Sequence, residues 1–191
     1  RFGEKVMFFR FDAQKAIQAA SVLLRFDPTR QMSRKRLLAL LYLADRAAIK
    51  ETGRPIIGGH PVAMDHGPIH SEVYDLIKGG TSFEQEWSEH FQNSGYKLEL
   101  THDPGILSLS RYEIGKLNEL SETYANKDEW EVANVTHDLP EYEKNYVVGT
   151  SKKIPLEDII EHVGRGADKE AILKDAQEKA LFDSIFHGMI V

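Results

Sequence analysis

One helix limits what this chain can fold into more than any other feature. The segment SRKRLLALLYLADRAAIKETG begins at Ser33, a residue type that caps helix N-termini, and Gly53 and Pro55 follow its last turn. Apolar residues form one wide face of it and extend around the cylinder: Leu37, Leu38, Leu40, Leu41, Tyr42, Ala44, Ala47, Ala48 and Ile49. A helix that is apolar around so much of its girth is buried on nearly all sides. We therefore expect it to be the central helix of the fold.

Capping residues and apolar residues at helical spacing predict further helices along the chain. Asp12 is an N-cap candidate for a helix over residues 12–25. A Ser-x-x-Glu capping box at Ser110 begins another. We also expect a helix in TSFEQEWSEHFQNSG, a short one that ends near Thr136–His137, and two C-terminal helices over residues 155–185.

Strand signals are fewer. In YKLELTHDPGILSLS, apolar and polar residues alternate from Tyr96 to Thr101 and HDPG turns the chain, which predicts a hairpin with one wet face. PIIGGHPVAM predicts an extended segment or a small strand, and LPEYEKNYVVGTSKK an irregular connection. The expected fold class is mainly α: a compact helical bundle around a buried central helix, with a small antiparallel β-hairpin or sheet. We expect a single domain over residues 1–191.

Composition argues against several classes of protein. A net charge of −6 argues against a general binder of nucleic acid, whose domains usually carry a basic excess. The chain has no cysteine, so it forms no disulfide, thiolate zinc site or cysteine nucleophile. No apolar run approaches the roughly 20 residues that span a bilayer, and the first residues do not follow the signal-peptide pattern. We expect a cytoplasmic protein without membrane contact.

The stretch MDHGPIHSEVYDLIKGG carries the densest group of reactive side chains. His66 and His70 are four residues apart, the spacing of two metal ligands on one helix face. Gly67 and Pro68 lie between them, however, and interrupt such a helix. We expect instead that Pro68 occupies the first turn of a helix that Gly79 ends. No catalytic residue, metal ligand or cofactor is predicted from this stretch or from the rest of the sequence.

Two groups of side chains are candidates for a binding surface. The basic group consists of Arg30, Arg34, Lys35 and Arg36. A solvated face is the favoured interpretation, and a contact patch for an acidic partner or for nucleic acid is the alternative. The aromatic group consists of Trp87, Phe91, Tyr96, Trp130, Tyr142 and Tyr146. Most of these rings are expected in the core. Tyr142 and Tyr146, in the polar EYEKNY segment, are the ones we expect to be exposed.

The order of several short motifs resembles the Panacea domain. They are Leu40-Leu41-Tyr42 with Ala44 in the central helix, Gly67-Pro68 followed by Tyr74-Asp75, and Thr136-His137 near a later helix end. Where that family often has Trp after the Thr-His pair, the nearest aromatic residue here is Tyr142. The resemblance covers roughly residues 33–137, so the helix over 12–25 and the helices over 155–185 are extensions of it.

The resemblance implies a non-enzymatic antitoxin that neutralises a cognate protein toxin by direct binding. The implied partner surface lies near the Gly-Pro turn and the Thr-His end, and its candidate residues are Tyr42, His66, Gly67, Pro68, Tyr74, Thr136, His137 and Tyr142. One alternative is a small-ligand-binding or hydrolytic domain with Tyr42, Asp65, His66 and His137 in one polar pocket. A second is a DNA-binding regulator that uses residues 30–36. Self-association stays open.

Overall fold

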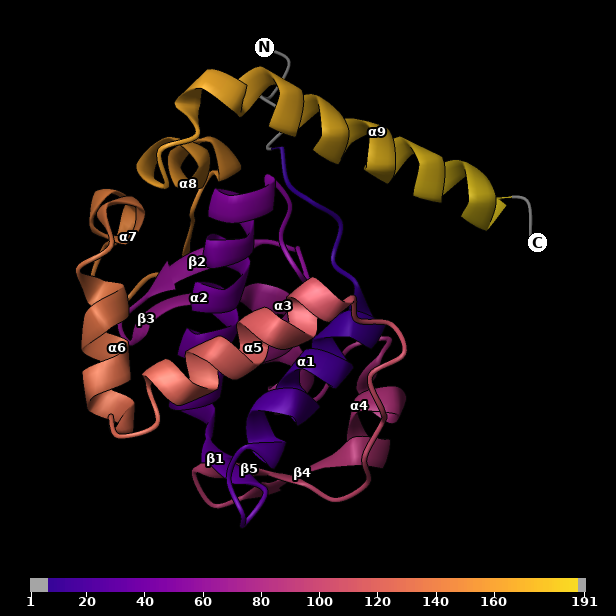
Figure 1. Cartoon of the computed structure of the whole chain (residues 1–191), viewed down its shortest axis with the longest axis vertical. Coiled ribbons are helices and arrows are strands. Elements are labelled where there is room, and N and C mark those ends of the chain that lie inside the picture. Colours follow the sequence, from indigo (N-terminus) through magenta and orange to yellow (C-terminus); the bar gives the residue numbers. More distant parts are fainter. Residues whose placement is uncertain (1–6, 189–191) are drawn as a thin grey trace.

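The central helix of the fold is α2 (Arg34–Thr52), as predicted. A computed structural model of the chain describes residues 7–188, and α2 runs through the middle of it (Figure 1). Ser33 Oγ accepts a hydrogen bond from the backbone N–H of Arg36, and Gly53 ends the helix with a φ of 79°. Side chains of α2 belong to both apolar core clusters of the molecule, which explains why the helix is apolar around most of its girth.

Three helices with strong caps pack close to α2. They are α1 (Ala13–Arg25), α5 (Arg111–Thr123) and α6 (Glu129–His137), and Figure 1 shows α5 crossing in front of α1 and α2. Asp12 accepts from the backbone N–H of Lys15, and reciprocal capping boxes begin α5 and α6. These caps are contacts within three residues, so the starts of the helices follow from local sequence.

The first small sheet has the strand order β1–β5–β4 and is antiparallel throughout. Its strands are β1 (Gln31–Ser33), β4 (Phe91–Ser94) and β5 (Lys97–Leu100), and α4 (Glu84–His90) precedes β4. The alternating residues after Tyr96 do form a strand, but the expected hairpin partner after HDPG was wrong. The chain turns at Gly95, which has a φ of 60°, so the partner of β5 is the strand before it, β4. The helix expected in TSFEQEWSEHFQNSG therefore ends at His90.

The second small sheet has the order β3–β2–β6. Its strands are β2 (Pro61–Met64), β3 (Gly67–His70) and β6 (Lys152–Lys153), and α3 (Ser71–Lys78) follows β3 directly. The prediction that Gly67-Pro68 begins a helix was wrong, because these residues pair with Met64 and Ala63 in a hairpin. Proline is tolerated there because β3 is an edge strand, and the helix begins only at Ser71.

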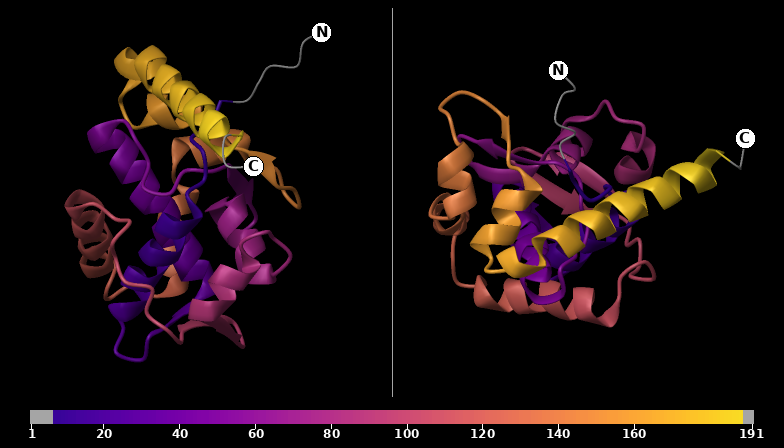
Figure 2. Two further views of the ribbon diagram at one scale, coloured as in Figure 1. Left: turned by 90° about the vertical axis from the view of Figure 1, so that its right-hand side faces the viewer. Right: turned by 90° about the horizontal axis from the view of Figure 1, so that it is seen from above.

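The C-terminal quarter of the chain supplies much of the second core cluster. It contains α7 (Pro140–Asn145), α8 (Leu156–His162), a 3₁₀ turn (Gly166–Asp168) and α9 (Lys169–Gly188). The connection expected to be irregular therefore holds α7 and β6. The second half of α9 extends beyond the rest of the molecule (Figures 1 and 2).

The sequence also predicts an apolar tail from Phe186 to Val191, and this segment is only partly described. Phe186 lies in α9, where its ring contacts that of Phe182, and residues 189–191 lie outside the described part of the chain. Within residues 7–188, no helix combines the length and the apolar character required to cross a membrane.

Candidate functional site

A buried carboxylate organises the interior next to α2. Asp45 is 5% exposed, and its Oδ1 accepts backbone N–H bonds from Ile56 (2.8 Å) and Ile57 (3.0 Å). Its Oδ2 accepts from the N–H of Gly58 (3.0 Å) and lies 2.9 Å from Nε2 of His70. Four donors thus saturate one carboxylate, and they tie the loop after α2 and the end of β3 to the central helix.

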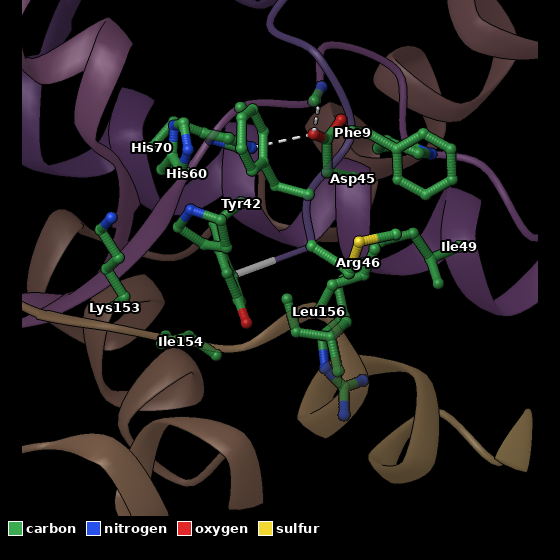
Figure 3. A pocket seen from close by; sticks show the side chains of 17 residues that line it. Phe9, Tyr42, Asp45, Arg46, Ile49, His60, His70, Lys153, Ile154 and Leu156 are labelled. Carbon is green, nitrogen blue, oxygen red and sulfur yellow. Dashed lines mark hydrogen bonds and ion pairs between the residues drawn. The ribbon is translucent and has the colours of Figure 1, made fainter. Parts of the chain in front are cut away.

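His70 is oriented by this contact. Because Asp45 accepts at 2.9 Å, we place the proton of the ring on Nε2, which leaves Nδ1 as a buried acceptor without a partner among the described residues. A cavity of about 30 Å³ adjoins the ring, room for one or two water molecules. In Figure 3, Asp45 and His70 lie on one side of this cavity, with Lys153, Ile154 and Leu156 on the other.

A second buried charge cluster lies on the next face of α2. Glu141, with 0% exposure, accepts from Nε (2.5 Å) and Nη2 (3.3 Å) of Arg46 and from the hydroxyl of Tyr42 (3.1 Å). Burial and the neighbouring carboxylate of Glu141 raise the pKa of Tyr42 well above its usual value. Tyr42 is therefore a neutral donor that satisfies a buried anion, and its hydroxyl does not reach the surface.

The Gly-Pro and Thr-His motifs meet in space. Gly67 has a φ of 113°, and a Cβ built on it would lie 2.7 Å from Oγ1 of Thr136 and 3.5 Å from the ring of His137. The hydroxyl of Thr136 donates to the carbonyl of Ala133 (2.7 Å) inside α6. The β2–β3 hairpin therefore packs so closely on the end of α6 that only glycine fits at residue 67.

Three stacked rings, those of His137, Tyr142 and Tyr146, lie next to this contact between Gly67 and α6. The ring of Tyr142 stacks on His137 (centroids 5.2 Å apart) and on Tyr146 (5.1 Å). The hydroxyl of Tyr142 donates to the carbonyl of Met64 (2.8 Å), and burial raises the pKa of Tyr142 to about 12. The hydroxyl of Tyr146 donates to Oδ1 of Asp65 (3.0 Å). The expectation that Tyr142 is exposed was wrong, since the stack buries it.

An open groove lies beside the hairpin turn. It has a volume of about 530 Å³ and lies between the first turn of α2, the β2–β3 hairpin, α3 and residues 149–151. Its lining includes Arg34, Lys35, Leu38, Met64, Asp65, His66, Ile69 and Tyr74. Of the residues predicted for partner binding, His66, Gly67 and Tyr74 line this groove.

The eight predicted partner-binding residues divide by burial. His66 is exposed, and Tyr74 and His137 are half-buried. The side chains or backbone of the other five are buried: Tyr42, Gly67, Pro68, Thr136 and Tyr142. These five shape the surface from beneath it, and a partner that binds this face contacts His66, Tyr74 and their exposed neighbours.

The four residues of the alternative polar pocket are not brought into one concavity. Tyr42 lines the small cavity of Figure 3, whereas Asp65 and His66 line the open groove, and His137 is covered by Tyr142. In the described part of the chain, no three His, Asp or Glu side chains are grouped closely enough to hold a metal ion.

The order of the motifs and their contact in space agree with a comparison against known families. A family model described as "Antitoxin SocA-like, Panacea domain" matches residues 37–142, more than half of the chain. This chain belongs to that family. Searches of curated proteins and of solved structures find no match.

The matched region of this Panacea domain contains the hydrogen bonds of Asp45 and Glu141 and the contact of Gly67 with Thr136, whereas Tyr146 and the groove residues Arg34 and Lys35 lie outside it. It runs from α2 to α7 and leaves out α1, α8 and α9. Sequence reasoning missed Asp45, Arg46 and Glu141. The sequence does contain a signal for Asp45. It is an acidic residue within a helix predicted to be buried, and a buried carboxylate needs hydrogen-bond partners inside the fold.

Proposed function

We propose that this Panacea domain is an antitoxin that neutralises a protein toxin by binding it directly. The observation that carries the proposal is the family match over residues 37–142, whose description is an antitoxin. The surface near the β2–β3 turn supports the same view, because the Gly-Pro and Thr-His motifs meet there, beside an open groove lined by the exposed His66 and the half-buried Tyr74.

Neutralisation in this proposal is steric. A stable interface of standard size takes about 800 Å² from each partner. The accessible surface of the molecule is 10645 Å², so an interface of this size takes under a tenth of it. By covering the active or substrate-binding surface of the toxin, the domain stops the toxin without any chemistry of its own. The saturated hydrogen bonding of Asp45 and Glu141 supports this non-enzymatic role, because neither carboxylate is free to act on a substrate.

We also propose that the domain acts in the cytoplasm and holds a cognate toxin there. The absence of cysteine suits a reducing compartment. The toxin is sought first among the products of the genes beside that of this chain, because a toxin and its antitoxin must be made together.

The test is binding together with rescue. The purified chain is titrated calorimetrically with the product of the adjacent gene, and the same pair is co-expressed in a growth assay. We expect saturable binding and restored growth, with no effect from an unrelated protein of similar size and charge. Absence of both binding and rescue with every neighbouring gene product would contradict the antitoxin proposal.

A further inference from the structure

The open groove beside the β2–β3 hairpin combines an apolar floor with basic edges. Leu38 and Ile69 are buried in its floor, and Met64 and Tyr74 are half-exposed. Arg34 and Lys35 border it from the first turn of α2. Lys78 lies near the same edge, with Nζ 4.9 Å from the ring centroid of Tyr74.

These three cations lack neutralising partners. Among the ion pairs of the described residues, none involves Arg34, Lys35 or Lys78. Arg34 donates to the side-chain oxygen of Asn93 (3.2 Å), and Nζ of Lys35 lies 3.2 Å from the ring centroid of the exposed Trp130. Each positive charge therefore stays available to an incoming anion.

The position of Arg34 and Lys35 is unfavourable for the isolated fold. Both lie in the first turn of α2, where the helix dipole favours acidic side chains and disfavours cations. Their neighbour Arg36 has a structural use, since it donates to the carbonyls of Tyr124 and Lys127 at the end of α5. No comparable contact with a buried acceptor accounts for Arg34 or Lys35 within the described structure.

One carboxylate lies in the groove, and the fold already uses it. Oδ1 of Asp65 accepts from the hydroxyl of Tyr146 (3.0 Å) and from the N–H of Gly149 (2.8 Å). These donors hold the pKa of Asp65 below its usual value, the backbone N–H being the larger cause. Both donors are neutral, so Asp65 keeps its negative charge. The two cations Arg34 and Lys35 outnumber it in the lining of the groove, which is therefore net positive although the chain as a whole carries −6.

We infer that this groove binds an acidic segment of the toxin that also presents an apolar side chain. Carboxylates of the segment pair with Arg34 and Lys35, and its apolar side chain packs between Met64 and Tyr74. This inference rests on the proposed antitoxin function and adds the chemistry of the partner to it. Complementary charge speeds the encounter and selects the partner, while the apolar contact slows dissociation.

An apolar floor favours a protein segment over nucleic acid. Interfaces with DNA are polar and take most of their affinity from many phosphate contacts. Here only two cations, Arg34 and Lys35, line the groove, and its floor of Leu38, Met64 and Ile69 offers an apolar side chain a better contact than it offers a phosphate.

The test reverses the two charges in the full chain. We compare the wild type with Arg34→Glu/Lys35→Glu in calorimetric titration with the product of the adjacent gene, at 50 and 200 mM salt. The helix dipole favours glutamate at both positions, so the variant is expected to fold. We expect binding to weaken at least about tenfold, together with loss of the salt dependence that the wild type shows.

A matched control carries the same change of charge elsewhere. Lys50→Glu/Arg111→Glu replaces two cations that belong to none of the described ion pairs and lie away from the groove, at the far end of α2 and the start of α5. The control is expected to bind like the wild type. A neutral Arg34→Gln/Lys35→Gln variant is expected to lie between the wild type and the reversed variant.

The outcomes separate the inference from the function. Unchanged binding by Arg34→Glu/Lys35→Glu would overturn the acidic-segment inference and leave the antitoxin proposal intact. Equal losses in this variant and in the control would also overturn it, because net charge rather than the groove would then be the cause. If the wild type binds no neighbouring product but binds a labelled duplex of its own promoter through Arg34 and Lys35, both proposals fail in favour of a DNA-binding regulator.

Discussion

The buried carboxylates beside α2 and the open groove at its first turn place charge in opposite ways. Asp45 and Glu141 are almost fully buried, and each accepts several hydrogen bonds from the protein itself. Arg34 and Lys35, which share helix α2 with Asp45, lie at a surface groove and belong to none of the ion pairs of the described residues. One helix thus carries charges that hold the fold together and charges that the fold does not use.

Burial explains the difference. An unpaired charge in the interior costs several kcal/mol, so buried charges have to be satisfied within the fold. A charge in a wet groove costs little and stays free for a partner. Polar residues inside this molecule are therefore structural, and candidates for recognition lie where charge is left without an internal partner.

The largest expected effect is the loss of the buried carboxylate. Asp45→Ala leaves three backbone N–H groups and His70 without their acceptor, so we expect the free energy of unfolding to fall by about 3–5 kcal/mol. Urea denaturation measures this change. Asp65→Ala is the matched control, because Asp65 accepts two hydrogen bonds at an exposed site and its loss is expected to cost about 1 kcal/mol or less. Equal losses of unfolding free energy in the two variants would show that burial does not set the cost of removing a carboxylate.

The next effect depends on pH. Because the pKa of Tyr142 rises from 10.0 to about 12 in the folded state, the unfolded chain loses this proton first as the pH increases. The stability that the neutral hydroxyl contributes is complete below pH 10 and falls by about 2–3 kcal/mol between pH 10 and 12.

Tyr142→Phe isolates this contribution. The variant is expected to be less stable than the wild type at pH 9 by about 1 kcal/mol, because it lacks the hydrogen bond to Met64. It is expected to become the more stable of the two near pH 12. Urea denaturation at both pH values measures the crossing, and a constant difference between the two proteins would show that Tyr142 ionises alike in both states.

A smaller effect tests the close approach of the hairpin to α6. Gly67→Ala forces a φ of 113° on an L-residue and places a methyl group against Thr136, so we expect a loss of about 2 kcal/mol in unfolding free energy. Gly95→Ala is the control: its φ is 60° and no atom lies within 4 Å of the added Cβ, so about 1 kcal/mol is expected. Thermal or urea unfolding of both variants compares them. A Gly67→Ala variant as stable as Gly95→Ala would mean that residue 67 is not held against α6.

The smallest expected effect concerns the two cations of the groove and their contribution to stability. Arg34→Glu/Lys35→Glu is expected to leave the free energy of unfolding unchanged or to raise it by a few tenths of a kcal/mol, because the helix dipole favours glutamate there. The same denaturation experiment measures it. A loss above about 1 kcal/mol would mean that the fold uses these cations after all, and it would weaken their assignment to a partner.

Local signals in the sequence predicted much of the helical structure. Asp12, Ser33 and Ser110 cap helices that begin where the residues predict, because each cap is a hydrogen bond within three residues. Expectations failed where strand pairing or burial decides the outcome, because no local signal in the sequence contains those contacts. Nothing near Tyr142 predicts its stacking on His137, and HDPG is a plausible turn that the chain does not use for a hairpin.

The sequence by itself determined a mainly α protein built around α2, because the apolar girth of that helix demands cover on all sides. Only the tertiary structure decided what Gly67 and Pro68 do, because a proline can begin a helix or lie in an edge strand, and pairing with Met64 and Ala63 selects the strand. Tertiary structure likewise decided which charged residues of α2 have partners inside the fold. Asp45 meets donors from residues 56–58 and 70, whereas Arg34 and Lys35 meet an open groove, and such contacts between distant segments exist only once the chain has folded.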